Sequence, residues 1–241
     1  MIYVRSFVFL VLFNLFSTLL AVGMIPLYVF PSRATRVGIR LWGVIGTVLL
    51  RVVCGIRTEI RGREHLPAGA SLIAGKHLSM YDTCAPFLFL PDTAFVMKKE
   101  LTVIPLFGWY CLKGRMIVVD RDGGSTALKK LVADSRDRFA DGRQVLIFPE
   151  GTRSKLGEPG DYKPGIAALY RELDMPCCLM ATNSGAHWQN KSFLKIPGAI
   201  VFEFLPPIPP GLKRGAFMKE LEERLETASN ALLAESFPPP S

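Results

Sequence analysis

Cysteine is scarce in this chain, and its spacing excludes the usual disulfide and zinc frameworks. No Cys-x-x-Cys pair occurs among the five residues, which are Cys54, Cys84, Cys111, Cys177 and Cys178. An odd number with two adjacent members does not make a disulfide framework, and a His-Glu-x-x-His metal motif is also missing. We therefore expect a reducing compartment and no bound metal.

Acidic residues are almost missing from the first quarter of the chain. Residues 1–63 contain eight arginines and a single acid, Glu59, a net charge of +7. Because the whole chain carries +8, the remaining residues sum to +1. Nucleic-acid-binding proteins usually carry their basic patch on the folded domain, so we expect no nucleic-acid partner. Arginines beside apolar helices suit anionic lipid head groups, so we expect a position on the cytoplasmic face of a membrane, with a bacterial inner membrane as the expected location.

Long apolar stretches concentrate in residues 1–56 of a chain that is 49% hydrophobic. Residues 6–30 are uncharged and exceed the ~20 residues that a helix needs to span a bilayer. A second stretch over residues 37–56 is interrupted by Arg40 and Arg51. Since its charge-free centre is too short to span a bilayer alone, it predicts an interfacial or re-entrant helix.

A signal peptide is the alternative interpretation of the first apolar stretch. Arg5 precedes it, and the small residues Ala21 and Gly23 form a small-x-small pair. The apolar residues continue past Gly23, however, and a second membrane-seeking stretch follows. This favours an N-terminal membrane element of two helices over residues 1–56.

Beyond residue 56, short apolar strands alternate with helical segments. Leu128, Leu131, Ser135 and Phe139 share one helix face, and Gly142 is placed to end that helix. A C-terminal helix repeats the pattern, and a proline-rich segment over 206–210 predicts a stiff turn before it. This alternation predicts an α/β domain over 57–236, with a mixed sheet flanked by helices, and a disordered tail over 237–241. The predicted strands are 56–60, 71–75, 94–97, 116–119, 144–148, 177–182 and 199–204.

His77 stands out among the three histidines. It follows the apolar strand 71–75 and precedes a polar turn that ends at Asp82. A side chain that follows a strand into a loop is held rigidly yet exposed. A turn between the two residues can bring the carboxylate onto the imidazole, where it would fix the tautomer and stabilise the imidazolium. The His-x4-Asp spacing also arises by chance, and a loop histidine is often merely solvated.

A second motif, Phe-Pro-Glu-Gly-Thr-Arg-Ser over 148–154, follows another apolar strand. Gly151 lets the backbone approach a ligand, and Arg153 offers a fork of donors that matches phosphate. The alternative is an ordinary strand-to-loop turn with a capping Thr152 and a solvated arginine.

Together the two motifs resemble the 1-acylglycerol-3-phosphate acyltransferases. Lys-His-Leu-Ser-Met-Tyr-Asp over 76–82 is similar to the family's HxxxxD block, and 148–154 to its FPEGTRS block. Segment 98–121 looks like the block that carries an acceptor-phosphate arginine, and 175–185 looks like the last block. That last block departs from the family, which usually has Val-Pro-Val-Ala where this chain has Cys-Leu-Met-Ala over 178–181. The resemblance covers about residues 55–210.

The resemblance implies roles for individual residues. His77 would be the general base and Asp82 its orienting partner. The acceptor would be bound by residues of the other blocks, namely Lys98, Arg121, Glu150, Gly151, Thr152 and Arg153. For Lys98 a solvated charge beside Lys99 is an equal alternative. The implied reaction is transfer of a fatty acyl group from acyl-CoA or acyl carrier protein to the sn-2 hydroxyl of 1-acylglycerol-3-phosphate, giving phosphatidate at a phospholipid surface without a cofactor.

Other functions remain as alternatives. A serine or cysteine hydrolase would also use histidine and aspartate, but the chain has no Gly-x-Ser-x-Gly elbow, and Ser79 and Cys84 lack a nucleophile's context. A membrane-bound lipid-binding or scaffold protein would keep the fold without the activity. Within the family, the acceptor can be another lysolipid, such as a lyso-aminolipid. Backbone N–H groups near Gly151 are candidates for binding the oxyanion.

Overall fold

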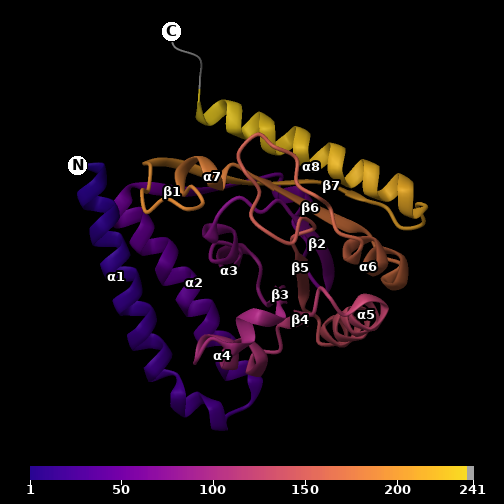
Figure 1. The fold of residues 1–241 in the computed structure, drawn as a ribbon, viewed down its shortest axis with the longest axis horizontal. Coiled ribbons are helices and arrows are strands. Elements are labelled where there is room, and N and C mark those ends of the chain that lie inside the picture. Colours follow the sequence, from indigo (N-terminus) through magenta and orange to yellow (C-terminus); the bar gives the residue numbers. More distant parts are fainter. Residues whose placement is uncertain (238–241) are drawn as a thin grey trace.

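A computed structural model describes residues 1–237 and contains a seven-stranded sheet with helices on both faces (Figure 1). Each strand overlaps one of the predicted segments, and the order across the sheet is β1-β7-β6-β2-β5-β3-β4. The predicted tail lies, apart from Phe237, outside the described residues. The strands are β1 (Ile56–Arg61), β2 (Ser71–Gly75), β3 (Thr93–Lys98), β4 (Ile117–Val119), β5 (Gln144–Ile147), β6 (Cys177–Thr182) and β7 (Gly198–Ile208).

The sheet is mixed, as predicted. Strands β6, β2, β5, β3 and β4 run parallel, whereas β7 is antiparallel to β6 and pairs in parallel with β1. The carboxyl ends of the five parallel strands therefore meet at one edge of the sheet. Loops at such an edge are the usual place for a ligand site in α/β proteins.

Both faces of the sheet are buried, because side chains of β2 alternate between two hydrophobic cores. Leu72 and Ala74 pack with helices α5, α6 and α8, whereas Ile73 packs with α1, α2 and α3. The helices are α1 (Ile2–Gly23), α2 (Ser32–Cys54), α3 (Pro86–Phe89), α4 (Phe107–Lys113), α5 (Gly124–Ala140), α6 (Gly165–Leu173), α7 (Ser184–His187) and α8 (Arg214–Ser236). Short 3-10 helices are η1 (Ile25–Val29), η2 (Arg63–His65), η3 (Met80–Thr83) and η4 (Lys99–Val103).

The predicted helical faces are confirmed. Leu131 and Ser135 are buried on α5, and Leu221 and Leu225 are buried on α8. After α5, Gly142 adopts φ 75°, a left-handed conformation that suits glycine and ends the helix.

The N-terminal residues form two long helices that lie side by side along the domain (Figure 1). Both are long and apolar enough to cross a membrane by length and composition. The second helix, α2, begins earlier than predicted and is continuous from Ser32 to Cys54. Arg40 does not interrupt it, since its side chain turns toward the domain and donates to the Phe87 carbonyl (3.3 Å). Gly55, with φ 70°, ends the helix.

Helix α1 touches the rest of the protein at both of its ends. Near its start, the Ser6 hydroxyl accepts a hydrogen bond from the Lys195 backbone N–H (2.8 Å). Near its end, the Ala21 carbonyl accepts one from the Tyr110 hydroxyl of α4 (2.6 Å). Between these points, Phe9 belongs to the core on that side of the sheet. The helix pair therefore forms one wall of the domain.

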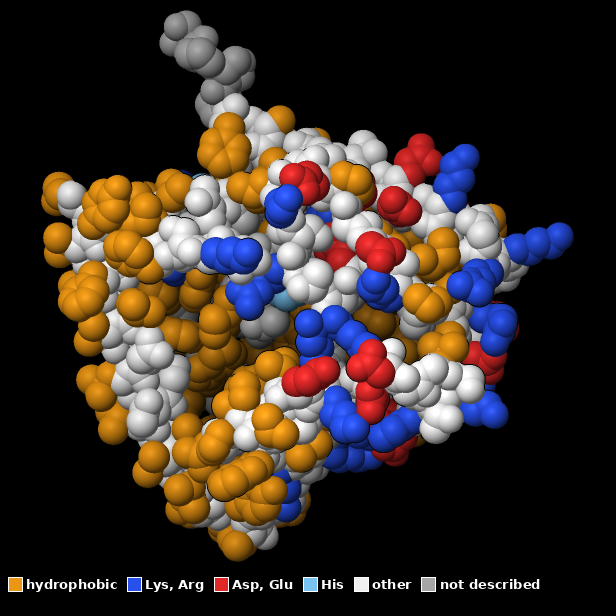
Figure 2. Space-filling model, viewed as in Figure 1, with side chains coloured by type: hydrophobic (Ala, Val, Ile, Leu, Met, Phe, Trp, Pro, Cys, Tyr) orange, Lys and Arg blue, Asp and Glu red, His pale blue; other side chains and the backbone are white. Residues whose placement is uncertain are grey.

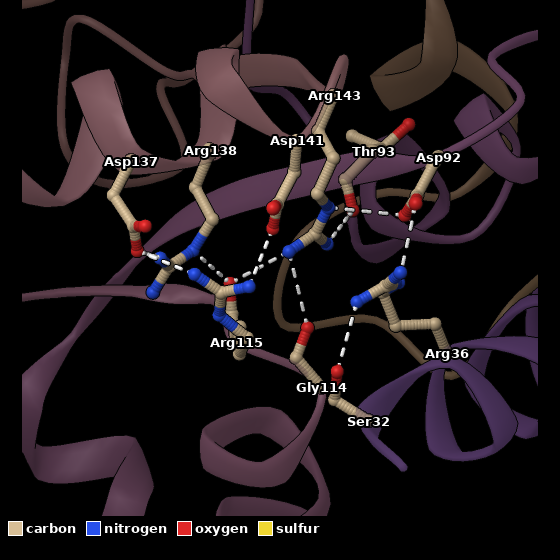
Figure 3. Close-up of polar contacts among 10 residues, drawn as sticks. All are labelled: Ser32, Arg36, Asp92, Thr93, Gly114, Arg115, Asp137, Arg138, Asp141 and Arg143. Atoms are coloured by element: carbon tan, nitrogen blue, oxygen red, sulfur yellow. Dashed lines mark hydrogen bonds and ion pairs between the residues drawn. The ribbon is translucent and has the colours of Figure 1, made fainter.

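Charged residues fasten α2 to the amino ends of the central strands (Figure 3). Arg143, just before β5, is fully buried and donates to the Asp92 carboxylate (3.0 Å) and to the carbonyls of Gly114, Arg115 and Thr93. The other oxygen of Asp92 lies 3.1 Å from Arg36 of α2. Burial lowers the pKa of Arg143 to about 10, so it stays charged at neutral pH.

The proline-rich segment corrects one prediction. Strand β7 continues to Ile208, so Pro206 and Pro207 lie inside a strand and not in a turn. Cys177 pairs with Ile208 and Leu179 with Leu205, which leaves two prolines opposite one residue of β6. Proline is tolerated in such a bulge because the backbone there does not need an N–H donor.

Candidate active site

His77 lies at the carboxyl edge of the sheet, two residues after β2 ends. Its Nδ1 is 3.0 Å from Oδ2 of Asp82, the contact that the spacing predicted. An ionised carboxylate can only accept, so Nδ1 carries the proton and Nε2 keeps its lone pair. The side chain is 14% exposed, and Nε2 has no hydrogen-bond partner among residues 1–237. The imidazole is therefore oriented to accept a proton at Nε2.

A tight turn fixes Asp82. Its Oδ2 also accepts the backbone N–H groups of Leu78 and Ser79, both at 2.8 Å. The Ser79 hydroxyl in turn accepts the N–H of Tyr81 (3.1 Å), which completes a capping box around η3. The local sequence thus holds the carboxylate by backbone donors. Asp82 is fully buried and cannot swing away.

The ring of Phe148 holds the plane of the His77 imidazole. The two rings are stacked with centroids 4.2 Å apart and an interplanar angle of 16°. Phe148 follows β5, the neighbour of β2, so parallel pairing brings the two loops together. A backbone bond from Ser154 N–H to the His77 carbonyl (2.9 Å) joins them again.

A buried ion pair lies beneath the histidine. Glu150 accepts the backbone N–H of His77 (3.1 Å) with one oxygen and binds the Lys76 ammonium and the Ser154 hydroxyl with the other. Lys76 also donates to Glu226 of α8 (2.6 Å). Glu150 therefore holds the backbone of the loop that carries His77, and both of its oxygens have protein partners.

Tyr162 completes this network. Its hydroxyl donates to Glu226 (3.1 Å), and burial followed by the nearby carboxylates raises its pKa, so the hydroxyl stays protonated. Sequence reasoning gave no role to Lys76, Phe148, Tyr162 or Glu226. Lys76 and Phe148 stand inside the two motifs, whereas nothing in the sequence connects Glu226 with residues 150 positions earlier.

The loop after β5 meets the segment after β4 through Arg121, whose guanidinium donates to the Gly151 carbonyl. Gly151 has φ 66°, and a Cβ at this position would lie 2.8 Å from that guanidinium. Only glycine combines this conformation with the close approach. The Gly151 N–H donates to the Phe148 carbonyl (2.9 Å) and is not free to bind an oxyanion. The N–H groups of Thr152 and Arg153 form no hydrogen bond within residues 1–237.

The other predicted residues lie around this group without contacting it. Thr152 and Arg153 are exposed on the loop, and the Arg153 side chain has no partner in the described chain. Lys98 ends β3 beside Val119 of β4 and likewise makes no side-chain bond there. Figure 2 shows a hollow on this face, with hydrophobic side chains toward the N-terminal helices and Lys and Arg side chains gathered on its other side.

The geometry disfavours a covalent nucleophile. Ser79 is fully buried, and its hydroxyl is used by the capping box. Cys84 is also buried, and desolvation raises its pKa to about 12, so it remains a thiol. His187 is buried, with Nδ1 3.0 Å from the Ile196 carbonyl. His77 is thus a histidine that a buried carboxylate orients and whose Nε2 has no partner among residues 1–237.

Comparison with known proteins gives consistent results. Residues 57–182 match the model of a family described as Acyltransferase. A 1-acyl-sn-glycerol-3-phosphate acyltransferase of Pseudomonas aeruginosa is 33% identical over 211 residues, which are 87% of this chain and 82% of that protein. A protein of the same name from Limnanthes douglasii is 29% identical over 187 residues, 77% of this chain and 66% of that protein.

A solved structure has a similar fold. The crystal structure of the 1-acyl-sn-glycerophosphate (LPA) acyltransferase from Thermotoga maritima matches with a TM-score of 0.78 and 21% identity. The match covers 97% of this chain and 98% of that one, so both the N-terminal helices and the sheet fall within it.

Proposed function

Because the chain belongs to the acyltransferase family, we propose that it transfers a fatty acyl group from a thioester to the sn-2 hydroxyl of 1-acylglycerol-3-phosphate, giving phosphatidate. The observation that supports this most directly is the His77–Asp82 pair, with Nε2 of the imidazole open at the carboxyl edge of the sheet. Residues 57–236 would form the acyltransferase domain and residues 1–56 the membrane anchor.

His77 acts as general base in this proposal. Its Nε2 takes the proton of the acceptor hydroxyl as the oxygen attacks the thioester carbonyl. When the tetrahedral intermediate collapses, the carbon–sulfur bond breaks and the imidazolium returns the proton to the leaving thiolate. Asp82 stabilises the imidazolium between these steps. A general base typically contributes about 10²–10⁴-fold, so alignment of the substrates and oxyanion binding supply the rest.

Three cations lie, like His77, at the carboxyl ends of the parallel strands and suit the acceptor's phosphate monoester. Arg153 has an uncommitted guanidinium, Arg121 is anchored on the Gly151 carbonyl, and Lys98 ends the adjacent strand. Arginine forks match phosphate geometry. The free N–H groups of Thr152 and Arg153 are our candidates for the oxyanion donors. The arginines around α1 and α2 support a position on the cytoplasmic face of the membrane.

The test follows phosphatidate formation and thiol release in mixed micelles with lysophosphatidate, first with acyl-CoA and then with acyl carrier protein as donor. Wild type is compared with His77→Ala, and thermal unfolding checks that the variant is folded. We expect phosphatidate from wild type and a loss of at least ~10²-fold in the variant.

Other outcomes would revise the proposal in different ways. Acylation of another lysolipid alone would keep the reaction and change the acceptor. Thiol release that persists in His77→Ala without a lipid product would contradict the role of His77 and favour a hydrolase.

A further inference from the structure

We propose that the segment η4–α4 (Lys99–Lys113) is a second membrane-contacting element, which inserts into the lipid surface beside α1 and α2. The inference rests on the membrane association contained in the proposed function, and it adds a contact outside the N-terminal helices. It starts from exposed apolar side chains that the reaction does not use.

The composition of the segment is unusual for a protein surface. Residues 101–112 contain no charged side chain. Five large apolar residues are nevertheless exposed there: Val103 (77%), Ile104, Phe107, Trp109 (50%) and Leu112. Single exposed apolar residues are ordinary, but a cluster of this kind marks an interaction surface.

The segment is a compact unit. A Cβ on Gly108 would lie 2.2 Å from the Thr102 carbonyl oxygen, so α4 folds directly back onto η4. Leu106, between the two, has φ 62°, a conformation that is unfavourable for a non-glycine residue. The surrounding contacts hold this turn, and the exposed apolar side chains are presented by a defined structure.

This surface continues into the N-terminal helices. The Tyr110 hydroxyl donates to the Ala21 carbonyl, and its ring lies 6.4 Å from that of Tyr28 in η1. Around Tyr28, the exposed side chains are again apolar, namely Ile25, Val29 and Phe30. Figure 2 shows hydrophobic side chains covering both the α1 side and the α4 end of this face.

The chemistry of the rim fits a lipid surface. Lys113 closes the segment and lies 5.4 Å above the Tyr28 ring, where an ammonium can reach head groups from an apolar base. Tryptophan and tyrosine, here Trp109 and Tyr28, are typical of the membrane interface. A second copy of the chain is the competing occupant, but continuity with the apolar N-terminal helices favours lipid.

The contact would fix how the enzyme sits on the membrane. Two antiparallel helices alone leave the domain free to roll about their common direction. A second contact at α4 removes that freedom, because it lies on a separate element. Since η4 directly follows Lys98 at the end of β3, the lipid surface would reach the rim of the candidate site.

Trp109 itself is the probe. The full chain is reconstituted with vesicles of phosphatidylethanolamine and phosphatidylglycerol, with or without brominated acyl chains. The emission of Trp109 is obtained as the difference between wild type and Trp109→Phe, and no turnover is needed. We expect brominated chains to remove most of this difference emission. The proposal would be overturned if the protein co-sediments with the vesicles but the Trp109 emission is the same with and without brominated chains. Trp109 would then face water or a second copy of the chain.

A matched pair of variants gives an independent measure. Phe107→Ser should lower the vesicle partition coefficient about tenfold, the value for removing one large apolar side chain from lipid. Phe237→Ser, at a similarly exposed phenylalanine beyond α8, should change it less than about twofold. Equal effects of the two variants would contradict a specific contact through α4. Failure of acyl transfer would leave both measurements intact, so the two proposals fail separately.

Discussion

The two ends of the parallel strands carry charged residues in opposite arrangements. At the amino ends, Arg143 uses its guanidinium nitrogens on a carboxylate and three carbonyls (Figure 3). At the carboxyl ends, Lys76 and Glu150 are also paired, but Nε2 of His77 and the guanidinium of Arg153 are left without partners among residues 1–237. A buried donor such as Arg143, whose hydrogen bonds are all made within the protein, stabilises the fold. An oriented side chain such as His77, with one nitrogen unpaired, can still bind or deprotonate a ligand.

The largest difference between the two ends is expected for substitutions of their aspartates, Asp82 and Asp92. Asp82→Asn keeps the side-chain shape but removes the charge that stabilises the imidazolium. We expect kcat to fall about 10²–10⁴-fold with little change in stability. The control is Asp92→Asn at the other end, which should lower the melting temperature and leave kcat of the folded enzyme near wild type. A large loss of kcat in both variants would show that the two ends are not separable.

Replacement of Arg143 tests the structural end alone. Arg143→Met leaves Asp92 and three carbonyls without their buried donor, so the free energy of unfolding should fall by about 3–5 kcal/mol. Denaturant unfolding measures this. Arg171→Met, at an exposed arginine on α6, should change stability by less than about 0.5 kcal/mol. Similar losses in both variants would mean that the buried network contributes nothing particular.

A smaller effect is expected where α8 reaches the catalytic end. Glu226→Gln removes one of the two carboxylates that bind Lys76, a charge-assisted contact of about 1.5–3 kcal/mol. Because Glu150 then holds Lys76 alone, we expect kcat to fall by less than about tenfold with KM unchanged. Glu223→Gln, exposed on the same helix, is the control. If KM rises instead, Glu226 contributes to acceptor binding.

The smallest predicted effect concerns Lys195, a buried lysine near Trp188 whose pKa is lowered to about 8 by burial. An unfolded chain keeps lysine protonated up to about pH 10.4. Between these values Lys195 binds more protons in the unfolded state, so this residue contributes a rise in stability with pH from about 8 to about 10.5. Because buried thiols and tyrosines contribute the opposite slope in the same range, the contribution of Lys195 is read as the difference between wild type and Lys195→Met. Lys195→Met should lack this slope. An identical pH dependence in both proteins would contradict the lowered pKa.

Much of this architecture could be predicted because it depends on local patterns. Apolar segments such as 71–75 form the strands. Gly142 ends α5 because glycine readily adopts the left-handed conformation found there. The His77–Asp82 contact follows from one turn of five residues. Pro206 and Pro207 misled the prediction because a bulge opposite Cys178 removes the donor requirement that usually excludes proline from a strand.

Long-range pairings could not be predicted in the same way. Lys76 contacts Glu226 because α8 packs across β6 and β7, which brings Glu226 close to the carboxyl end of β2. In the sequence Arg40 interrupts an apolar stretch. The Phe87 carbonyl that accepts its hydrogen bond lies 47 residues away and cannot be identified from the sequence. Such contacts depend on the packed fold, and single-sequence patterns carry no signal for them.

The attachment of α1 at both of its ends has a consequence for how this protein can be handled. Phe9 and Phe13 of α1, with Leu50 of α2, fill the same core as Ile73 and Met180 of the sheet. Deleting the two helices would uncover that core, so we expect a chain cut before β1 to aggregate in water. The two helices thus close the interior of the domain in addition to their proposed contact with lipid.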